Sequence, residues 1–167
     1  MMRLLTPADT DAWFHLRLSA LADSPHSFYV ALEEERSRGI AEWRKRFDKP
    51  TTEGFVVGSF DGAQLVGNVG VFRDDGAQGQ HKAMIWGVYV APGHRRQGWG
   101  VAMLREAMAQ ARRVGIEKLL LGVDATNAPA RAAYEAVGFR EYGLERDCFR
   151  VSGVPVDEVL MDLRLVD

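Results

Sequence analysis

Hydrophobic side chains recur every three or four positions in three parts of the chain, which is the spacing of the buried face of a helix. These sets are Trp13, Leu16 and Ala20, then Ile40, Trp43 and Phe47, and finally Val101, Leu104, Met108 and Ala111. The first helix should begin at Thr6-Pro7, which offers an N-cap and a proline suited to a first turn. A shorter fourth helix should begin near Asn127, with Pro129 in its first turn, and end at Gly138. Between the first two helices, residues 23–39 are predicted to form a loop with at most a short helix.

Runs of β-branched, aromatic and aliphatic residues predict strands at about 2–5, 55–60, 65–72, 83–90, 119–123, 139–150 and 154–165. Asp61-Gly62 suits a tight turn, so the second and third strands should form an antiparallel hairpin. The run 83–90 has apolar residues at both parities, so it should be covered on both faces and lie centrally. The order β-α-α-β-β-β-α-β-α-β-β predicts an α/β fold with a mixed, largely antiparallel sheet of about seven strands and four helices. A single domain over residues 1–167 is expected.

Composition excludes several classes of partner. The 167 residues include 21 basic and 23 acidic side chains, a net charge of −2 at pH 7, without the basic block that would favour nucleic acid. The apolar runs are strand-sized and the N-terminus has no signal pattern, so we expect no membrane association and a cytoplasmic location. Cys148 is the only cysteine, which excludes an internal disulfide and a cysteine-rich metal site. Its place in an alternating stretch favours an unreactive structural thiol, and no metal is expected.

The segment Arg95-Arg96-Gln97-Gly98-Trp99-Gly100 joins the central strand to the most regular helix. A helix N-terminus carries unpaired N–H groups and partial positive charge, so it attracts anionic oxygens. Each glycine there costs about 1 kcal/mol of helix stability, which indicates another role, such as close approach of a phosphate to the main chain. Two nucleotide-binding signatures are excluded. Met103 stands where a dinucleotide fingerprint needs a small residue, and no G-x-x-x-x-G-K-S/T loop is present.

This segment resembles the pyrophosphate loop Gln/Arg-x-x-Gly-x-Gly/Ala of the GNAT superfamily of acyl-CoA N-acyltransferases, with Arg95, Gly98 and Gly100 at the defined positions. The resemblance resumes at Leu121-Gly122-Val123, at Asn127 and over residues 134–139, so it covers residues 83–140 specifically. It implies a GNAT-like fold and direct transfer of an acetyl group from acetyl-CoA to a primary amine, without an acyl-enzyme. The amine would belong to a small molecule or a protein. Homodimers are frequent in this superfamily, which leaves a homodimer as one open alternative.

The resemblance also assigns residue roles. Backbone groups of Val88 and Val90 would pair with the pantetheine arm and polarise the acetyl carbonyl, while amides from Arg96 to Gly100 would hold the pyrophosphate. Asn127 would contact the cofactor, and Tyr134 would be the catalytic acid that protonates the departing thiolate. An N-cap for Asn127 and a core position for Tyr134 are the structural alternatives. The expected cofactor-binding residues are Val88, Tyr89, Val90, Arg95, Arg96, Gln97, Gly98, Trp99, Gly100, Asn127, Arg131 and Tyr134.

No general base can be assigned from the sequence. Some superfamily members carry a glutamate fourteen residues before the first motif glycine, where this chain has Met84. Each of the other candidates suits a surface or structural position better: Glu33, Glu34, His81, His94, Asp124 and Glu158. The acceptor pocket is expected between the early helices and the last hairpin, near aromatic residues that suit a core equally well: Phe28, Tyr29, Trp43 and Phe149. Two other functions stay open, a non-catalytic acyl-CoA-binding sensor and an enzyme that uses a longer acyl-CoA.

Overall fold

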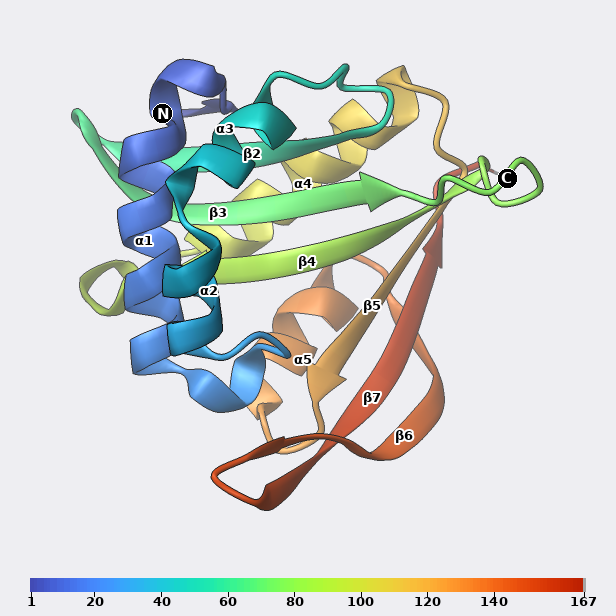
Figure 1. Cartoon of the computed structure of the whole chain (residues 1–167). Coiled ribbons are helices and arrows are strands. Elements are labelled where there is room, and N and C mark those ends of the chain that lie inside the picture. The colour runs from blue at the N-terminus through green and yellow to red at the C-terminus, as the bar shows by residue number, and fades with distance from the viewer. Residues whose placement is uncertain (167) are drawn as a thin grey trace.

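The computed structural model describes residues 1–166, which form one seven-stranded sheet and five α-helices (Figure 1). The strands are β1 (Met2–Leu4), β2 (Gly54–Asp61), β3 (Gln64–Arg73), β4 (Lys82–Val90), β5 (Lys118–Asp124), β6 (Arg140–Val151) and β7 (Val154–Arg164). The helices are α1 (Thr10–Asp23), α2 (Leu32–Arg38), α3 (Ile40–Phe47), α4 (Trp99–Arg113) and α5 (Ala128–Ala136). The strand order is β1-β2-β3-β4-β5-β7-β6, and only the β4–β5 pair is parallel among these strands. The predicted α/β fold is confirmed, and Asp167 lies outside the described residues.

Helix α2 is the one helix beyond the four that the sequence predicts, and it lies in the segment 23–39, which is predicted to form a loop with at most a short helix. Its buried residue is Glu35, a carboxylate, so this helix has no hydrophobic repeat for a sequence pattern to detect. Glu35 accepts hydrogen bonds from Trp43 Nε1 at 2.6 Å and from Arg17 Nε at 3.2 Å. A buried ion pair and an indole therefore attach α2 to α1 and α3.

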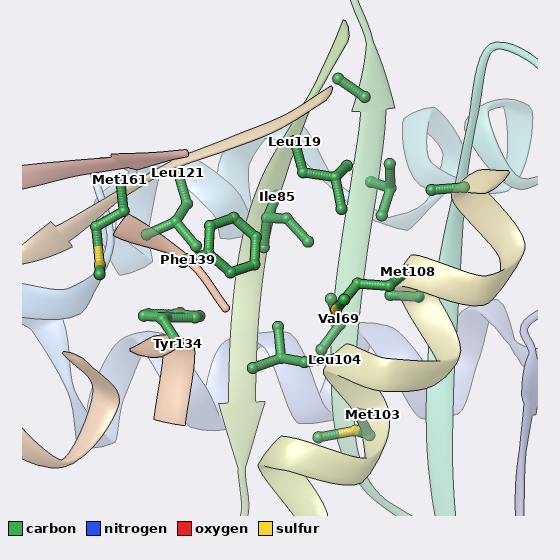
Figure 2. Close-up of a cluster of buried hydrophobic side chains, with 14 of the residues drawn as sticks. Val69, Ile85, Met103, Leu104, Met108, Leu119, Leu121, Tyr134, Phe139 and Met161 are labelled. Atoms are coloured by element: carbon green, nitrogen blue, oxygen red, sulfur yellow. The ribbon is translucent and has the colours of Figure 1, made fainter. Parts of the chain in front are cut away.

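The helices cover both faces of the sheet. Helices α1, α2 and α3 lie on the face turned toward the viewer in Figure 1, and α4 and α5 lie behind it. Behind the sheet, Leu104 and Met108 of α4 pack with Ile85 and Leu119 in the larger hydrophobic cluster (Figure 2). In front, Trp43 of α3 stacks on Trp86 of β4, with ring centroids 5.4 Å apart. The sheet is thus the middle layer of three.

Strand β4 is central and covered on both faces, as its sequence predicts. Ile85 packs behind the sheet and Trp86 in front, but Val88 packs behind and Tyr89 in front, so the alternation is inverted between them. Gly87 causes this inversion, because its φ of +63° forms a bulge in which two β4 residues face one residue of β3. Apolar residues therefore occupy both odd and even positions of β4 for two reasons: both faces of the strand are buried, and the bulge reverses which face each side chain points to.

Beyond the bulge the sheet opens. Strand β5 pairs with β4 only where Lys82–Met84 lie beside Lys118–Leu120, and past these pairs the two strands diverge (Figure 1). Strand β5 instead pairs with β7 along its whole length. The opening between residues 85–90 of β4 and residues 121–124 of β5 is called the sheet split below. It leaves main-chain groups on the inner edge of β4 without a neighbouring strand.

Candidate functional site

The loop between β4 and α4 has the backbone of an anion-binding turn. Arg96 and Gly98 both adopt left-handed conformations, with φ of 60° and 83°, and Gly98 is the N-cap of α4. Successive amides in such a turn point into a shared concavity. A side chain at Gly98 would find no atom within 4 Å of its Cβ, so the glycine is required by the backbone conformation and leaves open space beside the loop.

The amides of this turn are free to bind a ligand. Within residues 1–166, no backbone or side-chain acceptor is found for the N–H groups of residues 96–101, whereas His94 and Arg95 donate to Ala91 and Pro92. The 15 residues of α4 place the positive end of the helix dipole at the same point. Unpaired amides at a helix N-terminus favour an anionic ligand, and the sequence-based prediction places the diphosphate of coenzyme A here.

The two arginines of the loop have different surroundings. Arg95 donates from Nε to the Val90 carbonyl at 2.9 Å, forms an ion pair with Asp23 and lies over the Tyr89 ring at 5.4 Å. These contacts attach the loop to β4 and α1, and the arginine holds the pKa of Asp23 below its usual value. Arg96 is exposed and forms no ion pair within residues 1–166. Its guanidinium is therefore the one in this loop that is available to an anion.

The side chains of Tyr89, Gln97 and Trp99 contact other parts of the protein. The Tyr89 ring is buried in front of the sheet, with its hydroxyl 3.4 Å from Asp23. It therefore points away from the larger hydrophobic cluster behind the sheet, called the rear cluster, against which Val88 and Val90 pack. Gln97 donates to the Gly93 carbonyl at 3.1 Å, and the Trp99 ring packs edge-on against His94.

Helix α5 brings its three predicted residues to one side of the molecule but gives them different contacts. Asn127 is the N-cap, accepting from the Ala130 amide at 3.2 Å. Arg131 donates to the Ala125 carbonyl at 3.3 Å and pairs with Glu141 of β6 at 3.2 Å, so its guanidinium is used by the protein. Tyr134 lies in the rear cluster with Phe139, at a centroid distance of 6.0 Å (Figure 2).

Tyr134 is 7% exposed, and no hydrogen bond to its hydroxyl is found within residues 1–166. Burial, and secondarily the negative charge of Glu158, raise its pKa well above the usual value of about 10. The hydroxyl therefore stays protonated at neutral pH. It can donate a proton but cannot act as a base. Because its pKa is raised, the pKa of Tyr134 exceeds that of a thiol by more than the pKa of an ordinary phenol does.

The aromatic residues proposed for the acceptor pocket divide into two pairs. Phe28 and Trp43 are 8% and 3% exposed and belong to the front core. Tyr29 and Phe149 pack edge-on with centroids 5.8 Å apart, joining the segment after α1 to the β6–β7 hairpin, and Tyr29 is 75% exposed. Tyr29 and Phe149 thus contact each other, whereas Phe28 and Trp43 are core residues, and the acceptor pocket stays a prediction.

Most of the base candidates have structural partners. Glu33 and Glu34 pair with arginines of their own helix, and His94 lies 3.0 Å from Asp61. Asp124 accepts from the amide and hydroxyl of Thr126. Glu158 differs, because it is half-buried and forms no ion pair within residues 1–166.

Cys148 lies beside Glu158, with Sγ 3.4 Å from Oε2. Burial first, and then hydrogen bonding to Glu158, raise the pKa of this thiol to about 12. A thiol with this pKa is protonated at neutral pH and is a poor nucleophile. The structural interpretation of Cys148 is therefore supported.

The structure contains two features that the sequence pattern does not predict, a bulge in β4 and a hollow beside α3. The Gly87 bulge lies beyond the last pair of β4 with β5, and Asn68 of β3 donates from Nδ2 to the Gly87 carbonyl. An isolated glycine within a strand pattern was the available signal for a bulge. A hollow of about 1010 Å³ lies between α3, the start of β2 and the β3–β4 connection, and Trp43, Met84 and Trp86 are part of its lining.

Within residues 1–166 there is no cluster of three or more histidine, cysteine or acidic residues that could hold a metal ion. The helices in this part of the chain are too short or too polar to cross a lipid bilayer.

Comparison with known proteins gives consistent matches. A model of the acetyltransferase (GNAT) family matches residues 1–139. Mycothiol acetyltransferase of Acidothermus cellulolyticus is 30% identical over 148 residues, covering 83% of this chain and 43% of that protein. Ribosomal protein bS18-alanine N-acetyltransferase of Escherichia coli K12 is 33% identical over 82 residues, covering 49% of this chain and 55% of that protein. The chain spans about half the length of the curated relatives that it matches.

Solved structures match over nearly the whole chain. A GNAT superfamily phosphinothricin acetyltransferase from Sinorhizobium meliloti, in complex with AcCoA, has a TM-score of 0.86 and 20% identity, covering 99% of this chain and 88% of that chain. Ribosomal-protein-alanine N-acetyltransferase from Brucella melitensis has a TM-score of 0.80 and 24% identity, covering 98% and 99% of the two chains. At these identities the matches show the fold alone.

Proposed function

The chain belongs to the acetyltransferase (GNAT) family, and we propose that it transfers an acetyl group from acetyl-CoA directly to a primary amine. The observation that carries this proposal is the turn of unpaired amides at residues 96–101, placed at the end of β4 beside the sheet split. A diphosphate held by the turn would leave the pantetheine arm to follow the free edge of β4. The thioester would then reach the split near the Gly87 bulge.

The chemistry follows from the groups at the split. Attack of an amine on a thioester places negative charge on the carbonyl oxygen, which preorganised backbone N–H groups of β4 would stabilise. When the C–S bond breaks, the thiolate needs a proton. Tyr134 has a protonated hydroxyl, with no hydrogen-bond partner found in residues 1–166, and is the proposed donor. The other proposed cofactor contacts are Val88 and Val90 through their backbone and Asn127 at the start of α5.

The acceptor class follows from the relatives only in outline. One relative is named a mycothiol acetyltransferase, another acetylates the alanine of a ribosomal protein, and a third is an aminoglycoside N(6')-acetyltransferase of Serratia marcescens. We propose a primary amine as the acceptor, received between the Tyr29–Phe149 pair and the sheet split. A cytoplasmic location, a homodimer and a single domain over the chain stay predictions from the sequence.

The test is amine-dependent release of free thiol from acetyl-CoA. The panel should contain a peptide with N-terminal alanine, an aminoglycoside, free amino acids and a short diamine. Thiol release above the amine-free rate, with a product heavier by one acetyl group in mass spectrometry, is expected for at least one amine. Binding of coenzyme A without transfer to any amine would instead support the acyl-CoA sensor. The raised pKa of Cys148 predicts a slow background reaction with the thiol reagent.

A further inference from the structure

A carboxylate from one strand fills the side-chain space of a glycine on the next. A Cβ at Gly122 of β5 would lie 2.3 Å from Glu158 Oε2 and 3.0 Å from its Cδ. Glu158 belongs to β7 and is paired with Asp124, so its side chain leans along the sheet to reach the space over Gly122. Only a residue without a side chain admits the carboxylate there.

This carboxylate lies at the edge of the sheet split. Gly122 is in the part of β5 beyond its last pair with β4. Leu121 and Val123 pack behind the sheet, so Gly122 faces the front, where the turn Pro25–Ser27 lies against β5. Tyr134 approaches from the rear cluster. The carboxylate and the phenol are therefore on opposite sides of the opening in which the thioester would react.

The surroundings of Glu158 are unusual for a carboxylate of this chain. Its polar neighbours are the Cys148 thiol at 3.4 Å and the carboxylates of Glu145 on β6 and Asp124 on β5, and no cation pairs with it within residues 1–166. Burial, and then these like charges, raise its pKa, while the thiol opposes the change. A carboxylate with a raised pKa is a stronger base and is closer to the pKa of about 10 of an alkylammonium.

We propose that Glu158 is the general base that deprotonates the acceptor ammonium, with Gly122 providing the space that lets it reach the split. This assignment rests on the proposed acetyl transfer. An N–H bond of the ammonium breaks and its proton moves to the Glu158 carboxylate, and the freed electron pair forms the C–N bond to the thioester carbon. The second ammonium proton is lost to water as the tetrahedral intermediate collapses. The C–S bond breaks, the thiolate takes the Tyr134 proton, and solvent restores both residues, so one proton is released per turnover.

The deciding variant is Glu158→Gln, which keeps the shape and removes the basic carboxylate. With the panel amine of highest turnover, kcat at pH 7 should fall by about 100-fold or more while the KM for acetyl-CoA stays unchanged. The residual rate should rise about tenfold per pH unit toward the amine pKa, because only free amine then reacts. The matched control is Glu135→Gln, which removes an exposed carboxylate of α5 that forms no ion pair within residues 1–166 and should keep kcat within about twofold.

Stability separates this role from a structural one. A half-buried carboxylate with a raised pKa destabilises the folded state above that pKa, so Glu158→Gln should be at least as stable as the wild type at pH 7. A second variant moves the carboxylate to β5. A Cβ at residue 122 would lie 2.3 Å from the position of Oε2 of Glu158 in the wild type. The carboxylate oxygens of an aspartate at this residue are two bonds from its Cβ, so Gly122→Asp combined with Glu158→Ala places a carboxylate close to the native one. A gain of about tenfold over Glu158→Ala alone is expected.

The outcomes distinguish the two proposals. Equal kcat and pH profiles for the wild type and Glu158→Gln, or no gain from Gly122→Asp in a folded protein, would exclude Glu158 as the base and leave the acetyl transfer intact. Absence of transfer by the wild type to every amine would refute the proposed function, and the base assignment with it.

Discussion

Replacing Gly98 by alanine tests the diphosphate cradle with a calculable cost to folding. Gly98 has φ of 83° and ψ of −2°, and its Cβ would meet nothing within 4 Å. The free protein therefore loses only the left-handed backbone preference, about 1–2 kcal/mol. For a chain of this size the melting temperature should fall by about 2–8 °C.

The bound state should lose more. The added methyl group occupies open space beside the amides that would hold the diphosphate, so at least one charge-assisted hydrogen bond should be lost. Such a bond contributes about 1.5–3 kcal/mol, which predicts a Kd for coenzyme A raised about 10- to 150-fold. Isothermal titration calorimetry with coenzyme A measures the affinity, and thermal unfolding without ligand measures the stability.

Two further glycines provide matched controls. Gly115, after α4, has φ of 75° and also has nothing within 4 Å of its Cβ, so Gly115→Ala should cost similar stability without affecting coenzyme A binding. Gly93 has the same open space without a positive φ, so Gly93→Ala should change neither quantity appreciably. If Gly98→Ala and Gly115→Ala bound coenzyme A equally well, the cradle assignment would be wrong.

Three other variants test separate parts of the structure. Tyr134→Phe should lower kcat by about 100-fold with little change in KM or stability, because no residue in the described part of the chain (1–166) hydrogen-bonds to its hydroxyl. Steady-state thiol release with unaltered kcat would exclude the acid role. Asp9→Asn should lower the free energy of unfolding by about 1 kcal/mol at pH 7, after allowance for the partly exposed Arg3. Hydrogen bonding to Arg3 lowers the Asp9 pKa to about 2, so this stabilisation is present above pH 4 and disappears toward pH 2. Urea unfolding at both pH values would show the difference. Glu35→Gln should cost about 3–5 kcal/mol by leaving the buried Arg17 guanidinium without its counter-ion, and urea unfolding with a loss below 1 kcal/mol would contradict this.

The elements with regular hydrophobic spacing were predictable from the sequence. Leu104 and Met108 lie on the buried face of α4, and β4 is the central strand because both of its faces are covered. Helix α2 was harder to detect because the residue it buries is Glu35, whose partners lie on α1 and α3. Burial by an ion pair leaves no hydrophobic period in the local sequence.

The candidate site was predictable to the extent that its chemistry is local. The turn at residues 96–101 depends on adjacent residues, and its amides are free as expected. The tether of Arg95 to Asp23 joins residues far apart in the chain, and the position of Glu158 over Gly122 depends on strand pairing. Neither follows from sequence order, because each requires the register and the direction of side chains across the sheet.

The most direct test of the central claim is an NMR titration of the ¹⁵N-labelled protein with coenzyme A, read at the backbone amides. The largest shifts are predicted at residues 96–101, with further changes at Val88 and Val90 on the edge of the split. Unchanged signals there, with shifts confined to the hollow beside Trp43 and Met84, would contradict the assignment of the donor site.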